Sequence, residues 1–261
     1  MQLLKRRPFW PGKRSRPSWS RAIRATPRAQ LRGEAHRPML PAELVERGQG
    51  RKLLFLHAGE GLAPERPWLD LLSRRYHVFA PWHPGYGGSP LIDSGAGGID
   101  DLAYLYLDLA TELDLEGVGA DLGGWIAAEM MVRSTARFSS LVLIAPLGIK
   151  LRGRDERDIA DFHAMTHAEY LRAAWAEPAK GEVDYTALSD DALAAIVRGR
   201  EAFALYGWKP YMHNPRLKRW LHRIDRPTLL LWGAQDGIVT PSYGDGWRRE
   251  IPGAKLAIIP G

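Results

Sequence analysis

An aspartate set among glycines is the part of this sequence with the clearest chemical potential. The run Gly119-Ala-Asp-Leu-Gly-Gly124 places Asp121 directly before a helical pattern that begins at Trp125. Glycines at this spacing allow a sharp strand-to-helix turn, and the N-terminus of the helix offers N–H groups to an anion. A carboxylate is already ionised at neutral pH, so Asp121 could attack a substrate without first losing a proton. Asp121 could equally be an inert residue in a chain without catalytic activity.

A second aspartate, Asp236, follows the apolar run Thr228–Trp232. Its position after a buried strand makes Asp236 a candidate site residue. The alternative is a turn-forming aspartate, because Gly237 comes next and Asp-Gly is a common turn pair.

Histidines that could serve as a base are poorly placed in the sequence. No histidine follows Ile259, and those that could lie near the site are His57, His83 and His213. The chain contains no cysteine, which excludes thiolate zinc sites, and no other metal site is predicted. His163 and His167, one helical turn apart, have no evident third ligand.

The secondary-structure elements that must position these residues can be recognised from about residue 50 onward. Short apolar runs alternate with helical patterns, which is typical of βαβ units and a mostly parallel sheet. We predict strands at Lys52–His57, Tyr76–Ala80, Leu141–Ala145, Thr228–Trp232 and Lys255–Ile259, and helices over Ile99–Leu115 and Trp125–Arg133. The strand leading to Asp121 is expected to be two or three residues short, because Leu115-Glu-Gly-Val118 contains a charge and a glycine.

Residues 150–225 contain helical patterns and no strand-like run. Thr166 and Glu169 form a predicted capping box, and Ser189 precedes a helix that should end at Gly207. A helical insertion between parallel strands is expected to be a lid over their carboxyl ends, where such sheets bind ligands. Its aromatic and Met side chains could line an apolar pocket or form the lid's own core; they are Trp175, Tyr185, Tyr206, Trp208, Tyr211 and Met212.

Four motifs in this order resemble the α/β-hydrolase fold family from about Arg51 to the last residue. They are Leu56-His-Ala-Gly59, His83-Pro-Gly-Tyr-Gly-Gly-Ser89, the turn at Asp121, and Leu231-Trp-Gly-Ala-Gln-Asp-Gly-Ile-Val239. The resemblance implies an α/β fold with a mostly parallel sheet, flanked by helices and carrying a helical lid insertion. The implied divisions are a first part of the core over 41–149, the lid over 150–225 and a second part over 226–261.

The resemblance also implies roles for individual residues. Asp121 would be the nucleophile and Asp236 the acid, with the oxyanion hole formed by N–H groups of Leu122 and Gly59, or Ala58. The implied substrate pocket includes His57, Trp125, Trp208 and Tyr211. The implied activity is hydrolysis of a small apolar substrate at an ester or similar bond, without a metal or other cofactor.

Two departures from the family pattern leave alternatives open. Most members carry Ser in place of Asp121, and their catalytic histidine follows the last strand, where this chain has only Pro260 and Gly261. We therefore expect an impaired hydrolase, or else a non-catalytic ligand-binding protein. A third reading is a haloalkane dehalogenase or epoxide hydrolase, in which Asp121 forms an ester; those branches usually have Trp and Pro where this chain has Leu122 and Glu60.

The basic net charge of +6 belongs to the N-terminal segment. Residues 1–40 hold eleven Lys and Arg against one acidic residue, whereas the rest of the chain holds 25 basic and 29 acidic residues. We expect residues 1–40 to be a disordered extension without regular elements or the family's usual first strands, and nucleic-acid binding is not expected. No apolar run suits a secretory signal or a membrane span, so we expect a cytoplasmic protein.

Overall fold

The computed structural model describes residues 20–22, 41–62, 67–92, 97–113 and 116–260. The strands are β1 (Ser20–Ala22), β2 (Glu43–Arg47), β3 (Arg51–Leu56), β4 (Tyr76–Pro81), β5 (Glu116–Ala120), β6 (Leu141–Ile144), β7 (Thr228–Gly233) and β8 (Lys255–Ile259). The helices are α2 (Pro67–Ser73), α3 (Ile99–Leu113), α4 (Leu122–Arg133), α5 (His167–Ala174), α6 (Asp190–Gly207) and α7 (Pro241–Glu250). Short 3₁₀ turns occupy Pro178–Lys180, Tyr185–Ala187 and Lys218–Arg223.

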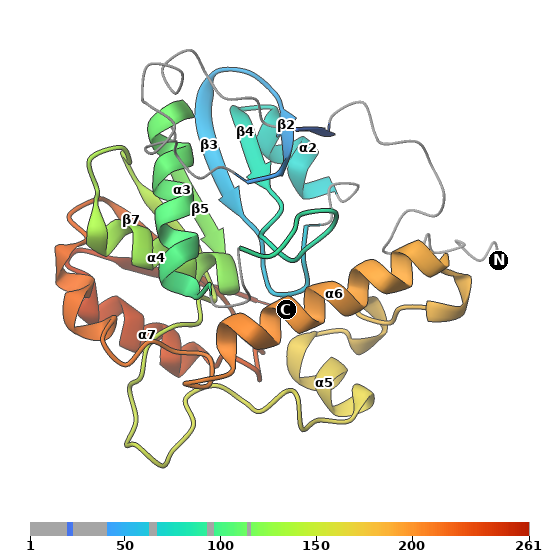
Figure 1. The fold of residues 1–261 in the computed structure, drawn as a ribbon. Coiled ribbons are helices and arrows are strands. Elements are labelled where there is room, and N and C mark those ends of the chain that lie inside the picture. Colours follow the sequence, from blue (N-terminus) through green and yellow to red (C-terminus); the bar gives the residue numbers. More distant parts are fainter. Residues whose placement is uncertain (1–19, 23–40, 63–66, 93–96, 114–115, 261) are drawn as a thin grey trace.

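The strands form one twisted sheet in the order β1-β2-β4-β3-β5-β6-β7-β8 (Figure 1). Neighbours from β4 to β8 run parallel, and β1 and β2 add an antiparallel edge. Strand interiors are apolar because helices flank the sheet, and Leu56, Val78, Leu143 and Leu230 are fully buried. The predicted α/β fold with a mostly parallel sheet is therefore confirmed.

The antiparallel edge corrects the prediction that the first strands are missing. β2 pairs with β4 along Leu44–Arg47, and β1 pairs with β2 inside the segment expected to lack regular elements. Strands of three and five residues are too short to show a periodic pattern, and edge pairing depends on backbone hydrogen bonds rather than on side-chain type. The other residues of the predicted disordered extension, 1–19 and 23–40, lie outside the described ones.

The central strand also corrects a prediction, since β5 is not shortened. Its residues pair with β3 from Glu116 to Gly119 and with β6 from Gly117 to Ala120. A strand with partners on both sides tolerates glycine because its backbone hydrogen bonds are made on each edge. Gly119 is also required by packing, because a Cβ atom there would lie 2.3 Å from the carbonyl oxygen of Gly123.

Between β6 and β7 the described chain forms helices and turns, with one isolated bridge joining Gly148 to His213. The capping box at Thr166 is confirmed, and Ser189 caps α6 as predicted by accepting a hydrogen bond from the amide of Ala192. α6 crosses beside the loops that follow β3 and β4 (Figure 1). We call residues 150–225 the helical insertion.

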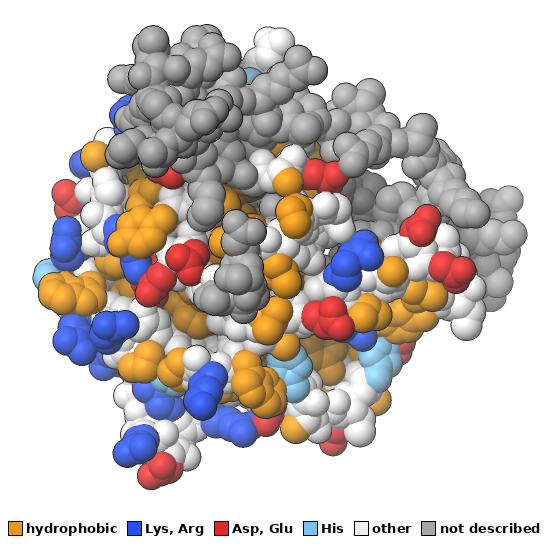
Figure 2. All heavy atoms as spheres, viewed as in Figure 1, with side chains coloured by type: hydrophobic (Ala, Val, Ile, Leu, Met, Phe, Trp, Pro, Cys, Tyr) orange, Lys and Arg blue, Asp and Glu red, His pale blue; other side chains and the backbone are white. Residues whose placement is uncertain are grey.

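On the face of the molecule seen in Figure 2, acidic, basic and hydrophobic side chains are interspersed. Exposed large apolar side chains include Val197 and Leu205 of α6 and the adjoining Trp208. Within the described ranges, no helix combines the length and apolar character that a bilayer crossing requires.

Candidate active site

Asp121 stands on a strained turn between β5 and α4. Its φ of 49° and ψ of −110° lie in a region that non-glycine residues rarely adopt. The turn is held by its amide, which donates to the carbonyl of Ile144 at 2.8 Å, and by its carbonyl, which accepts from the amide of Trp125 at 3.0 Å. Such strain persists only where the surrounding structure enforces it, and it concentrates at functional sites.

The carboxyl group of Asp121 lies against two backbone amides. Its Oδ2 accepts a hydrogen bond from the N–H of Gly59 at 3.0 Å, and the N–H of Leu122 also bonds the carboxyl. Burial raises the pKa of Asp121 to about 6; the two amides act against this shift, while the charges of Glu60 and Asp236 add to it. The N–H groups of Gly59 and Leu122, which were predicted to form the oxyanion hole, therefore lie beside Asp121. They already hydrogen-bond the carboxyl group of Asp121 itself.

Two buried histidines hold the turn that carries Gly59. His57 accepts at Nε2 from the amide of His83 at 2.9 Å, and its Nδ1 lies 2.8 Å from the carbonyl of Ala58. His83 places Nε2 3.0 Å from the carbonyl of His57 and Nδ1 2.5 Å from the hydroxyl of Tyr106. Burial lowers the pKa of His57 to about 3 and that of His83 well below its usual value, so both rings are neutral. The hydrogen bonds of the ring nitrogens of His57 and His83 therefore hold the turn that carries Gly59 in position.

Asp236 follows β7 and lies close enough to Asp121 for its charge to act on that carboxyl. Its Oδ1 accepts from the amides of Ile238 at 3.0 Å and Val239 at 2.8 Å, and burial raises its pKa. In the part of the chain that the structure describes, no histidine side chain hydrogen-bonds Asp121 or Asp236, and no group of three or more His, Asp or Glu is arranged for a metal ion.

Aromatic side chains of the helical insertion cover the turn beside Asp121. The ring of Phe203 lies over Gly59, where a Cβ atom would come within 2.4 Å of it. Phe162 stacks on Phe203 with ring centroids 5.6 Å apart, and Tyr170 donates its hydroxyl to Oε1 of Glu60 at 2.6 Å. The sequence did not predict this aromatic cover. Its one signal was Glu60, which stands where the haloalkane dehalogenase and epoxide hydrolase branches usually have proline.

The four predicted pocket residues are found in different surroundings. Tyr211 reaches the aromatic cover, with its ring centroid 6.2 Å from that of Phe162. Trp208 is 61% exposed, although its ring lies edge-on to that of Tyr211 with centroids 6.5 Å apart, and His57 and Trp125 are enclosed by protein. The structure therefore does not gather these four side chains around one space.

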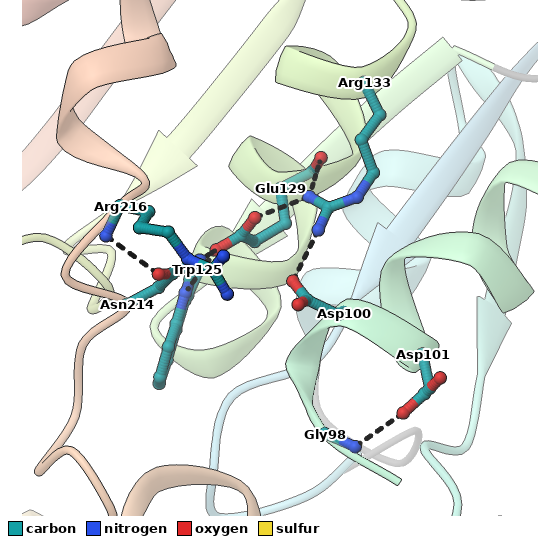
Figure 3. A network of polar contacts seen from close by, with 8 residues as sticks. All are labelled: Gly98, Asp100, Asp101, Trp125, Glu129, Arg133, Asn214 and Arg216. Carbon is teal, nitrogen blue, oxygen red and sulfur yellow. Dashed lines mark hydrogen bonds and ion pairs between the residues drawn. The ribbon is translucent and has the colours of Figure 1, made fainter.

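The indole of Trp125 belongs to a buried polar network (Figure 3). Glu129, 2% exposed, accepts at Oε1 from Nε1 of Trp125 at 3.2 Å and from Nδ2 of Asn214 at 2.8 Å. Its Oε2 pairs with Arg133 at 2.5 Å, and Arg133 also pairs with Asp100 at the start of α3. The carboxylate of Glu129 thus ties the helix behind Asp121 to the end of the helical insertion.

Replacing Asn214 with alanine is expected to lower the free energy of unfolding by about 1.5–3 kcal/mol, the usual worth of a hydrogen bond to a buried charged group. Urea unfolding measures the loss. Arg216→Ala is the matched control, because only the backbone N–H of that residue bonds Asn214. An equal loss in both variants would show that the contact with Glu129 is not what stabilises this segment.

Comparison with known proteins adds the family and the fold. A family model described as "Alpha/beta hydrolase family" matches residues 53–261. No curated protein matches the chain. Among solved structures, an esterase from Rhodococcus sp. ECU1013 is 19% identical, with 84% of this chain and 86% of that one covered and a TM-score of 0.63. A thermophilic esterase from Thermogutta terrifontis is 20% identical (84% and 85% covered, TM-score 0.63), and a 2-hydroxy-6-oxo-6-phenylhexa-2,4-dienoate hydrolase from Rhodococcus sp. strain RHA1 is 18% identical (84% and 86% covered, TM-score 0.62).

Proposed function

This chain belongs to the alpha/beta hydrolase family, and on that premise we propose that it hydrolyses small apolar substrates with Asp121 as its nucleophile. One observation carries the proposal: Asp121 stands on the strained turn after β5 with Oδ2 held by the amide of Gly59. With one oxygen fixed, the other is oriented for attack, and orientation of this kind contributes much of an enzyme's rate.

The geometry favours attack on a saturated carbon over attack on an ester carbonyl. Attack on a carbonyl would create an oxyanion that needs the amides of Gly59 and Leu122, which the carboxyl of Asp121 already uses. Attack on a saturated carbon creates no such oxyanion. A carboxylate oxygen of Asp121 bonds the carbon while the carbon–halogen or epoxide carbon–oxygen bond breaks. A halide departs with the electron pair, whereas an epoxide oxygen stays on the substrate, keeps the electron pair and takes a proton from solvent water.

Water then hydrolyses the resulting ester, which releases an alcohol and a proton and restores the carboxylate of Asp121. The aromatic cover formed by Phe162, Phe203 and Tyr170 supports an apolar substrate, because rings beside the nucleophile exclude water from it. The esterases and the dienoate hydrolase of similar fold support hydrolysis in general, without specifying the bond.

A second candidate function is ligand binding without turnover. It is favoured by the state of His57 and His83, whose ring nitrogens are all engaged inside the protein. In such a protein Asp121 would remain as a polar residue at the base of a binding site.

A substrate panel tests the proposal. Wild type and Asp121→Ala are incubated with styrene oxide, 1-bromobutane and 4-nitrophenyl acetate, and product formation and intact protein mass are followed. We expect epoxide or bromide turnover through a transient adduct on Asp121, with a loss of about 10³-fold or more in the variant.

Other outcomes have distinct meanings. Turnover that is equal in wild type and Asp121→Ala would remove Asp121 from the mechanism. Ester turnover that depends on Asp121, without epoxide or bromide turnover, would overturn the preference for saturated carbon. Ligand binding detected by calorimetry, with neither turnover nor adduct, would favour the second candidate.

A further inference from the structure

Glu60 extends directly from the residue that holds the nucleophile. Gly59 donates its N–H to Asp121 and accepts the hydroxyl of Tyr86 at its carbonyl, 3.1 Å away, so the turn is fixed on both sides. Because Glu60 directly follows Gly59, its backbone lies one residue from the amide that holds the carboxyl of Asp121, and its charge acts on that carboxyl. The mechanism proposed above gives Glu60 no role.

Tyr170 of the helical insertion orients Glu60. Its hydroxyl donates to Oε1 of Glu60 at 2.6 Å, a contact between residues 110 positions apart. α5, which carries Tyr170, is anchored by buried Leu171 and by its Ala173 carbonyl, which accepts from the amide of Gly237 at 2.8 Å. Burial, together with the charges of Glu60 and Asp121, holds the pKa of Tyr170 well above its usual value, so the hydroxyl acts as a donor.

Most polar atoms of the other groups at the site already have hydrogen-bond partners. Asp236 directs Oδ1 to two backbone amides of its own turn, and the nitrogens of His57 and His83 bond inside the protein. Among the described contacts, none engages Oε2 of Glu60. The same holds for Oδ2 of Asp236, but only Glu60 directly follows the residue whose amide holds Asp121, so we take Oε2 of Glu60 as the acceptor.

We infer that Glu60 is the general base that activates water to hydrolyse the Asp121 ester, with Tyr170 as its positioning residue. The inference rests on the proposed function. The water oxygen bonds the ester carbon of Asp121 while its proton moves to Oε2 of Glu60. The tetrahedral oxyanion is stabilised by the amides of Gly59 and Leu122. The alcohol then leaves with the proton from Glu60, and the carboxyl group of Asp121 loses its proton to solvent.

The test separates formation of the ester from its release. Wild type, Glu60→Gln and Tyr170→Phe are mixed with styrene oxide or 1-bromobutane under single-turnover conditions, and adduct mass and product are followed in time. In Glu60→Gln we expect ester formation within threefold of wild type and release slower by about 10²-fold, the usual contribution of a general base. In Tyr170→Phe we expect a smaller loss, about tenfold, confined to release.

Glu182→Gln is the matched control, because Glu182 is an exposed glutamate of the helical insertion that pairs with His167. It should leave both steps unchanged, and near-UV circular dichroism checks that each variant is folded. Equal release by wild type and Glu60→Gln would overturn the role of Glu60 while Asp121 keeps its own. Loss of ester formation in folded Glu60→Gln would also overturn it, and absence of both adduct and product in wild type would remove the proposed function as well.

Discussion

An Asp121→Asn variant is expected to be inactive and, at pH 8, more stable to urea than the wild type. Burial raises the pKa of Asp121 from 3.8 to about 6, so the folded state holds the proton more tightly than the unfolded chain does. Each pKa unit corresponds to 1.36 kcal/mol, so ionised Asp121 lowers the stability of the folded state by up to about 3 kcal/mol. Asparagine removes the charge, and its side-chain oxygen can still accept from Gly59.

The sign of this effect fixes its pH dependence. A raised carboxyl pKa contributes stability that is fully present below the unfolded value near 3.8 and is lost as the pH rises through about 6. The stability difference between Asp121→Asn and wild type should therefore be small at pH 4 and reach its maximum above pH 7. Asp155→Asn, at an exposed loop position, should show no such dependence. A difference that is the same at both pH values would contradict the buried-charge explanation.

If Asp121→Asn gains stability and loses activity, the result would help to decide whether Asp121 is a catalytic residue or an inert one. Natural proteins retain destabilising charges mainly where function needs them. An inert residue at position 121 would have no reason to combine a strained backbone, a buried carboxyl and two amide partners. A measured stability cost of Asp121 would therefore support its role as the nucleophile.

Features fixed by neighbouring residues could be predicted from the sequence. The capping box at Thr166 and the cap at Ser189 depend on side chains within three residues of the helix start. The strands β6 and β7 appeared as short apolar runs because they lie inside a parallel sheet, whereas β8 is an apolar run at the sheet edge, with Ile258 and Ile259 exposed. The turn at Asp121 was visible from its glycines, although Gly119 and Gly123 are required by the close packing of α4 rather than by a local backbone path.

Features fixed by tertiary packing could not be predicted in this way. The bond from Tyr170 to Glu60 joins two segments that no local pattern connects, and neither residue type is unusual in a surface helix or turn. The mutual bonding of His57 and His83 needed the loops after β3 and β4 to be placed side by side. A glycine in the β5 sequence led to the prediction of a shortened strand. The structure shows instead that Gly119 is required because α4 packs closely against it.

Gly123→Ala is expected to lower the free energy of unfolding by about 3 kcal/mol or more, or to prevent folding. A Cβ atom at Gly123 would lie 2.2 Å from the carbonyl oxygen of Leu56 and 2.7 Å from that of His57. Both are backbone atoms, at the last residue of β3 and the residue after it, so no side chain can move to make room. Urea unfolding measures the loss, and soluble expression shows whether the variant folds at all.

The same contact explains why this glycine matters for the site as well as for stability. The amide of Gly123 donates to the carbonyl of His57 at 3.1 Å, which fixes the spacing between α4 and the turn that carries Gly59. A methyl group would separate the two and with them the amides of Leu122 and Gly59, so any folded fraction should lose activity. Gly98→Ala is the matched control, because a Cβ atom there meets nothing within 4 Å, and its stability should change by less than about 1 kcal/mol. Losses of similar size in both variants would mean that glycine flexibility, and not the close approach of α4 to β3, sets the cost.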